Sequence, residues 1–245
     1  MNHTPQHSQQ AAGPRSRRLA LLATLAIVGQ VALVASAMLL PLWSEYDLVG
    51  DNISELALGQ HGFVQTAAFV VAGLGTLGLA FALRGLLRRL WGSQAGSVLV
   101  AIYGVAAILA AIFPADRIDR PADVTSLSTT GTIHVLVAWI GFLSIIAGMF
   151  VLTMTFARVY AWRWFSRWSV VLPASALALL SVQSQGPRIG LMQRLLVGVI
   201  AAWLILVASK VHALAARGPQ APRPRMLDRR RRWDDLASSK PYGRG

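Results

Sequence analysis

The sequence contains no cysteine. This absence excludes disulfide bonds, thiolate zinc sites, iron–sulfur clusters and cysteine nucleophiles. Charged residues are also scarce, at 13% of the chain, whereas hydrophobic residues make up 55% and the mean hydropathy is +0.53. Because soluble domains carry about twice this share of charge, the composition predicts an integral membrane protein.

Six apolar runs are long enough to cross a membrane as helices, which takes about 17 to 25 residues. They are Leu19 to Trp43, Gly62 to Leu83, Gly96 to Phe113, Thr132 to Phe156, Trp168 to Val182 and Gly190 to Val211. Within them, only Arg194 and Lys210 are acidic or basic residues. The sequence therefore predicts an all-α fold, a polytopic bundle of six transmembrane helices.

Two of these runs leave alternatives open. Arginines precede the first run and Ala35-Ser36-Ala37 resembles a signal-peptide cleavage site, but the apolar stretch continues through Leu42, so we expect an uncleaved span. The fifth run is short and contains Pro173. We expect it to be kinked or to extend back through Phe165.

The charges between the runs predict the orientation. With the N-terminus inside, all basic residues fall on the inner side except Arg117, Arg120, Arg188 and Arg194, and seven of the ten acidic residues fall outside. The positive-inside rule then places both termini in the cytoplasm, most simply at the plasma membrane. We expect a basic N-terminal segment (1–18), a transmembrane domain (19–213) and a disordered basic tail (214–245).

The net charge of +13 comes mainly from this topology and from the tail. The tail run Arg229–Arg232 would bind anionic lipids of the inner leaflet or simply fix the topology. Aromatic residues mix with arginines between Arg158 and Trp168, which is typical of a membrane-interface belt. We therefore expect the lipid bilayer, and no nucleic acid, as the partner of the basic residues.

The spacing Gly73-x-Gly75-x-x-Gly78 imitates a dinucleotide-binding fingerprint. That motif requires a strand that turns into a helix, whereas these glycines lie in the middle of a span. They instead predict a small-residue face for close helix packing, and Gly104 offers the next span a similar face. We expect no cofactor, and the small-residue faces permit a homo-oligomer without requiring one.

Residues capable of chemistry gather in the connectors that are predicted to lie outside. The candidate ligand-binding residues are Asn52, Ser54, Glu55, Asp116, His134, Arg188 and Arg194. The catalytic candidates are Ser54 as nucleophile, with His134 and Asp116. No metal site is expected, and the alternative would combine His134, Asp116, Glu55 and His61.

Plain structural roles compete with these assignments. Asn52 and Glu55 have the spacing of a capping box, which would lay a short helix on the membrane surface. Asp116 is either a turn residue or the ion-pair partner of Arg188 or Arg194. His134 is expected most simply as a hydrogen-bond donor or acceptor between helices.

Four short motifs together resemble a known family. They are Asn52-Ile-Ser-Glu-Leu56, Phe113-Pro-Ala-Asp116, His134 and Gly190-Leu-Met-Gln-Arg194. In this combination the chain resembles the domain-of-unknown-function 998 (DUF998) family of six-span membrane proteins, and more distantly the Frag1/DRAM/Sfk1 group, which is associated with lipid handling. The resemblance implies the fold and no established reaction.

We therefore expect a non-enzymatic multi-pass membrane protein with a polar pocket at the outer ends of the spans. The pocket would bind a zwitterionic or anionic lipid headgroup, or another small polar ligand, through the arginines and carboxylates. One alternative is an intramembrane hydrolase of lipid esters or amides, with or without a metal. Another is a small transporter.

Overall fold

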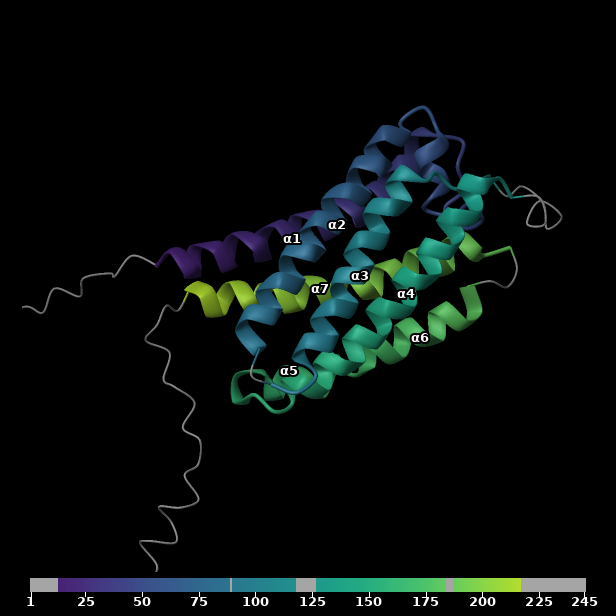
Figure 1. Cartoon of the computed structure of the whole chain (residues 1–245). Coiled ribbons are helices and arrows are strands. Elements are labelled where there is room, and N and C mark those ends of the chain that lie inside the picture. Colours follow the sequence, from purple (N-terminus) through teal and green to yellow (C-terminus); the bar gives the residue numbers. More distant parts are fainter. Residues whose placement is uncertain (1–12, 89, 118–126, 184–186, 217–245) are drawn as a thin grey trace, which may run out of the picture.

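The computed structural model describes residues 13–88, 90–117, 127–183 and 187–216. Within these ranges the regular structure consists of helices alone, packed as one elongated bundle (Figure 1). The N-terminal residues 1–12 and the tail 217–245, with the Arg229–Arg232 run, lie outside the described residues. The predictions of a disordered tail and of tail binding to anionic lipids therefore remain predictions.

The helices confirm the six predicted spans. They are α1 (Pro14–Leu39, continued by the 3-10 helix η1, Leu40–Trp43), α2 (Gly62–Leu87), α3 (Ser93–Ile112), α4 (Thr129–Phe156), α5 (Arg163–Ser169) followed by α6 (Val171–Gln183), and α7 (Ile189–Ala216). Each of the six is apolar and long enough to cross a membrane, with α5 and α6 together forming the fifth. Short 3-10 helices η2 (Glu55–Leu58) and η4 (Tyr160–Trp162) lie in the connectors.

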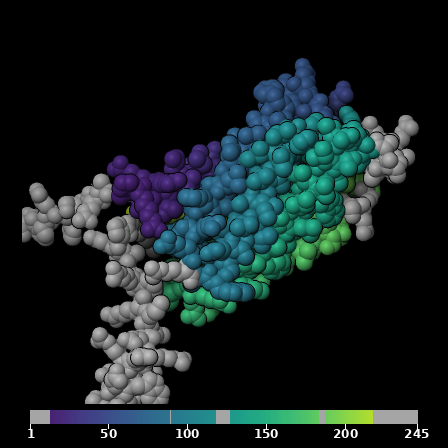
Figure 2. Space-filling model, in the orientation of Figure 1, coloured from purple at the N-terminus to yellow at the C-terminus, as the bar shows by residue number. Residues whose placement is uncertain are grey.

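The spans form an arc that closes only loosely. Along the arc the order is α4, α3, α2, α1, α7 and α6, and the arc closes through a small contact between α4 and α6. Helices α2, α3 and α4 form one continuous face of the molecule (Figure 2). The start of α1 and the end of α7 lie at the same end of the bundle (Figure 1). The assignment of this end to the cytoplasm remains a prediction.

The glycines of α2 allow close packing on two sides, as the sequence predicts. A β-carbon on Gly75 would lie 2.6 Å from the carbonyl oxygen of Leu25 in α1. One on Gly73 would lie 2.6 Å from the carbonyl oxygen of Gly104 in α3. Small residues let helix backbones approach closely in a membrane, where apolar side chains gain little by leaving lipid.

The fifth span is broken, as expected from Pro173. Helix α5 ends at Ser169 and α6 begins at Val171, with Val170 between them. Proline lacks an amide hydrogen and its ring clashes with the carbonyl four residues earlier, which for Pro173 belongs to Ser169. The helical segment extends back beyond Phe165, so both parts of the expectation are confirmed.

Aromatic side chains pack the bundle tightly at the end that holds α5. Phe156 stacks on Trp162 with ring centroids 4.3 Å apart and also contacts Trp203. The Trp203 indole donates a hydrogen bond of 2.8 Å to Ser169 Oγ. Trp162 is therefore a core residue, which corrects its assignment to the interface belt. Trp162 is buried because the connector places its ring against those of Phe156 and Phe165.

The rest of the predicted belt is exposed. Tyr160, Trp164 and Trp168 are among the most exposed large side chains in the described chain. Large apolar side chains are also exposed along the outward faces of the spans, as in Leu74 of α2 and Leu136 of α4. Such outward apolar surfaces suit a lipid environment, in which helices are not driven to hide them.

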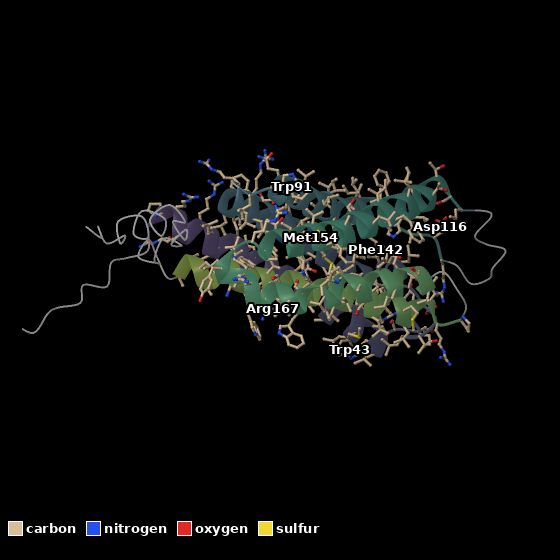
Figure 3. The ribbon with its side chains drawn as sticks, turned by 90° about the horizontal axis from the view of Figure 1, so that it is seen from below. Trp43, Trp91, Asp116, Phe142, Met154 and Arg167 are labelled. Carbon is tan, nitrogen blue, oxygen red and sulfur yellow. The ribbon has the colours of Figure 1, made fainter. Side chains whose placement is uncertain are left out.

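The two ends of the bundle differ in charge. Every acidic residue that the structure describes lies in the connectors at one end, which holds Asp116, whereas Arg167 lies toward the opposite end (Figure 3). We call the end that holds Asp116 the acidic end and the opposite end the basic end. The acidic end is the one predicted to be extracytoplasmic.

Candidate functional site

The first connector is held against the start of α7 by hydrogen bonds. The Leu191 amide donates to the Val49 carbonyl at 3.0 Å, and the Ile53 amide donates to Gln193 Oε1 at 2.6 Å. Two of the motifs singled out in the sequence, those around Ser54 and Arg194, are therefore in direct contact. A glutamine side chain bonding a backbone amide fixes the connector where no regular secondary structure does so.

Arg194 strengthens this attachment. Its guanidinium donates from Nη1 to the Asp51 carbonyl at 2.6 Å and from Nε to the Ala37 carbonyl at 3.2 Å. The side chain is 3% exposed, and Nη2 is buried without a partner among the described residues. Asp51, Asp47 and Glu55 attract its charge. Arg194 thus links α1, the connector and α7.

The connector inserts apolar side chains into the bundle. Ile53 and Leu56 are each 2% exposed, and Ile53 packs with Leu33 and Val197. The expectation of a helix lying on the membrane surface is therefore wrong. The hydrogen bonds to α7 pull the segment inward, where its apolar residues gain more contacts than they would at an interface.

The capping box is formed only in part. Glu55 bonds back to Asn52, whose side-chain amide donates to Glu55 Oε1 at 2.8 Å and whose backbone amide also contacts the carboxylate. Asn52 does not cap the helix, because η2 begins at Glu55 with Ser54 as its N-cap and no side-chain capping bond. The spacing predicts the correct pair of interacting residues but not the absence of the helix cap.

Asp116 caps the next span instead of pairing with an arginine. Its carboxylate accepts hydrogen bonds from the Ser128 amide at 2.6 Å and the Ser128 hydroxyl at 2.7 Å. Ser128 is the N-cap of α4 and accepts from the Gly131 amide. The predicted ion pair of Asp116 with Arg188 or Arg194 is therefore wrong. Arg194 donates its hydrogen bonds to backbone carbonyls, and Arg188 is exposed. A carboxylate at a helix N-terminus is stabilised by the free amides and the helix dipole.

His134 joins the end of α3 to the start of α4, as expected. Its Nδ1 lies 2.8 Å from the Phe113 carbonyl oxygen. A carbonyl only accepts hydrogen bonds, so Nδ1 carries the proton, and in the neutral ring Nε2 is an acceptor. The ring is buried and lines both of the cavities described next.

Two adjoining cavities lie inside the acidic end. The inner cavity, of about 60 Å³, is mainly apolar and is bordered by small residues such as Ala107, Ala110 and Gly141. The outer cavity, of about 260 Å³, is bordered on its polar side by Asn52, Ser54, Glu55, Asp116, His134 and Gln193. Both cavities share Ser54, His134, Ala138, Phe142 and Gln193 in their linings, so they adjoin.

The outer cavity lies between α4 and α6, beside exposed side chains of α4. Val135 and Trp139 of α4 line it and are 37% and 42% exposed, and Leu180 of α6 lines its other side. This is the place where the arc of helices closes only loosely. Phe142 lies farther along α4, between Asp116 at the end of the bundle and Met154 (Figure 3).

The outer cavity is acidic. Glu55 and Asp116 line it, and no lysine or arginine of the described chain does. Burial raises the pKa of the Glu55 carboxyl above its ordinary value, and nearby Asp51 adds to this. Hydrogen bonds from Asn52 and the charge of Arg117 act in the opposite direction.

Most of the predicted site residues are brought together, but not the arginines. Asn52, Ser54, Glu55, Asp116 and His134 line the outer cavity. Arg188 and Arg194 do not line it, and exposed His61 borders a separate hollow between α1 and α2. In the part of the chain that the structure describes, no three His, Asp or Glu side chains gather as a metal site. The alternative metal set is therefore not assembled.

Sequence reasoning missed several lining residues. They are Gln193, Tyr103, Trp139 and Phe142. A signal for Gln193 existed, because it precedes Arg194 in a motif already singled out. The aromatic residues offered none, since an aromatic residue in an apolar span faces lipid or the core with the same sequence pattern.

Comparisons with known proteins identify the family without a function. No curated protein and no solved structure was found to match the chain. The model of the family DUF998, described as a protein of unknown function, matches residues 26–210. This range includes all the motifs of the acidic end and most of the six spans. The chain is therefore a multi-pass membrane protein that belongs to the DUF998 family.

Proposed function

We propose that this protein binds a membrane amphiphile without transforming it, with the polar head in the outer cavity and the apolar part directed toward the bilayer. The observation that supports this most is the outer cavity itself. It has a polar wall, an adjoining apolar inner cavity and a place between α4 and α6 beside the exposed Val135 and Trp139. A ligand with one polar and one apolar end matches all three.

The polar wall offers groups that are not fully used within the protein. Ser54 is 8% exposed, and its hydroxyl makes no hydrogen bond to another described residue. His134 has an acceptor nitrogen left once Nδ1 is bound to Phe113. Both residues line the outer cavity, so a ligand bound there can form hydrogen bonds with these groups.

The cavity volumes decide which part of the ligand is enclosed. At about 260 Å³ the outer cavity lies just below the roughly 300 Å³ at which ligand pockets usually begin. The inner cavity, of about 60 Å³, has room for only about two water-sized groups at about 30 Å³ each. A headgroup fits these volumes, and a whole lipid does not. The chains must therefore lie against the exposed surface between α4 and α6.

A bulky substitution at Ala138 tests the proposal, because Ala138 borders both cavities. Leu136→Phe is the matched control, since Leu136 lies on the exposed side of the same helix. Native mass spectrometry of the protein in dodecyl maltoside would compare the lipids that each variant retains. We expect Ala138→Phe to lose a lipid that wild type and Leu136→Phe keep. Equal retention by all three proteins overturns the proposal.

The hydrolase alternative has its own test. Ser54 and His134 line the same cavity, but no hydrogen bond joins them among the described residues. A nucleophilic serine needs a base within hydrogen-bond reach. Labelling by a fluorophosphonate probe that Ser54→Ala abolishes would favour a hydrolase over simple binding.

A further inference from the structure

We propose that the head bound in the outer cavity is an organic ammonium group. This inference rests on the proposed function and specifies its ligand. The geometry behind it is the convergence of two carboxylates and two aromatic side chains on one cavity, Glu55 and Asp116 with Trp139 and Phe142. No basic side chain of the described chain lines that cavity.

Glu55 is the more buried of the two carboxylates. It is 3% exposed, and the hydrogen bonds it accepts come from the neutral amides of Asn52. Two arginines attract it from outside the lining: Arg194, and Arg117, which is stacked over the Tyr46 ring at 5.3 Å. A carboxylate is costly to bury unless cations and hydrogen bonds compensate it. A ligand cation inside the cavity adds to that compensation.

Asp116 plays a supporting role. Its carboxylate is occupied by the amide and hydroxyl of Ser128, at the N-terminus of α4. These donors are neutral, so the negative charge persists at the cavity wall. It adds to the electrostatic attraction for a cation without giving up its capping bonds.

The remaining lining suits an ammonium better than a metal ion. Aromatic faces attract ammonium groups, and quaternary ammonium ligands are often held by such rings. The Ser54 hydroxyl lines the cavity without a hydrogen bond to a described residue, so it can accept from an N–H group or contact a methyl group. A metal ion would need several converging ligands, and no such set of three is found among the described residues.

An anionic head is the wrong partner for this cavity. Arg194 is turned away to the carbonyls of Ala37 and Asp51, and Arg188 lies outside the lining. A phosphate placed here would face Glu55 and Asp116 without a basic residue of the described chain in the wall. Like charges in a site of low polarity repel strongly.

Four probes with the same dodecyl chain separate head chemistry from chain burial. They are dodecylamine, dodecyltrimethylammonium, dodecanol and dodecyl phosphate, titrated at pH 7 into the full-length protein in dodecyl maltoside and measured by native mass spectrometry. Wild type is compared with Glu55→Gln, which keeps the shape of the side chain. Glu45→Gln is the matched control, because Glu45 is an exposed acid of the same connector.

We expect an ammonium probe to bind about tenfold more tightly than dodecanol, a factor that corresponds to about 1.4 kcal/mol. Glu55→Gln should reduce this preference to about twofold or less without changing dodecanol binding, and Glu45→Gln should leave it intact. Tighter binding of dodecylamine indicates a primary amine head, and tighter binding of dodecyltrimethylammonium indicates a choline-type head. Should Glu55→Gln fail to fold, Trp139→Leu replaces it and should lower ammonium binding more than dodecanol binding.

The outcomes separate the two proposals. If dodecyl phosphate binds as well as the ammonium probes, or if the preference survives Glu55→Gln, the ammonium inference is wrong. Even if the ammonium inference is wrong, dodecanol binding that Ala138→Phe blocks would still support the proposed amphiphile site. If Ala138→Phe displaces none of the probes, the proposed function fails together with the inference.

Discussion

Gly190 lies directly against the backbone carbonyl of Asp51. A β-carbon at Gly190 would overlap that carbonyl oxygen and would lie 2.9 Å from Arg194 Nη1. The same carbonyl accepts the 2.6 Å hydrogen bond from Arg194. Gly190 thus provides the space in which the first connector approaches α7, and the cavity wall depends on that approach.

Replacing Gly190 by alanine should destabilise the protein. The added carbon has to push the Asp51 backbone away, and overpacking of this kind costs about 1–3 kcal/mol. Gly198→Ala is the matched control on the same helix, because its β-carbon would meet nothing within 4 Å. Alanine there should be neutral or stabilise by up to about 1 kcal/mol through helix propensity. Melting temperatures in dodecyl maltoside check both, and equal effects would contradict the close approach.

Removing the Arg194 side chain should also weaken the bundle. Arg194→Ala leaves the carbonyls of Ala37 and Asp51 without their donor, and lost hydrogen bonds to a charged group are worth about 1.5–3 kcal/mol each. Lysine should restore only part of the loss, since it lacks the planar fork that reaches two acceptors. Arg188→Ala is the control, because Arg188 is exposed. The prediction fails if the two alanine variants melt at the same temperature.

The sequence predicts the membrane architecture well because that architecture depends on composition. Apolar runs such as Gly62 to Leu83 must be helical in lipid, where every backbone group needs an internal partner. The glycine spacing around Gly75 predicts close packing for a similar reason. Both are properties of a segment by itself, so no knowledge of its neighbours is needed.

The partners of polar side chains depend on positions that a sequence does not contain. Asp116 has Arg194 and Ser128 as chemically reasonable partners, and only the fold places Ser128 beside it. Arg194 bonds backbone carbonyls, which every residue possesses, so its residue type gives no hint of them. Ile53 is buried because Gln193 binds its amide, and that contact spans most of the chain.

The bond between Asp116 and Ser128 should be measurable as a coupling energy. Asp116→Ala removes both hydrogen bonds, and Ser128→Ala removes the one from the hydroxyl, so their effects should not add fully. We expect each variant to lose about 1–2 kcal/mol, as for other helix caps. The double variant should lose less than the sum by about 0.5 kcal/mol or more. Additive effects in thermal unfolding would mean that the two residues do not act together.

Close packing of α2 on α1 makes a separate prediction. Gly75→Ala should lower the melting temperature, because its β-carbon would lie 2.6 Å from the Leu25 carbonyl oxygen. Overpacking there should cost about 1–3 kcal/mol. Gly85→Ala on the same helix is the control, since nothing lies within 4 Å of its β-carbon. A loss of stability in the control equal to that at Gly75 would mean that the effect does not come from the close approach of Gly75 to Leu25.

Stability should depend on pH through Glu55. Burial raises the pKa of this carboxyl in the folded protein above its ordinary value of 4.5, which the unfolded chain retains. Between the two values the folded protein holds a proton that the unfolded chain has lost, so this contribution to stability grows as the pH falls through the raised pKa. It is fully present below 4.5 and is lost as the pH rises above the raised pKa.

Glu55→Gln isolates this contribution, because glutamine keeps an acceptor oxygen for Asn52 and does not titrate. At neutral pH the variant should melt at a higher temperature than wild type, since it carries no buried charge. The difference should shrink as the pH is lowered toward 4.5, where wild-type Glu55 becomes protonated in both states. Asp51, Asp116, Arg117 and His134 lie near Glu55 but are present in both proteins. Their own titration therefore largely cancels in the comparison.

Addition of dodecylamine at neutral pH should raise the melting temperature of wild type more than that of Glu55→Gln, because the ammonium offsets the buried charge. A difference between the two proteins that stays constant from pH 7 to 4.5 would show that the Glu55 carboxyl keeps its ordinary affinity for protons.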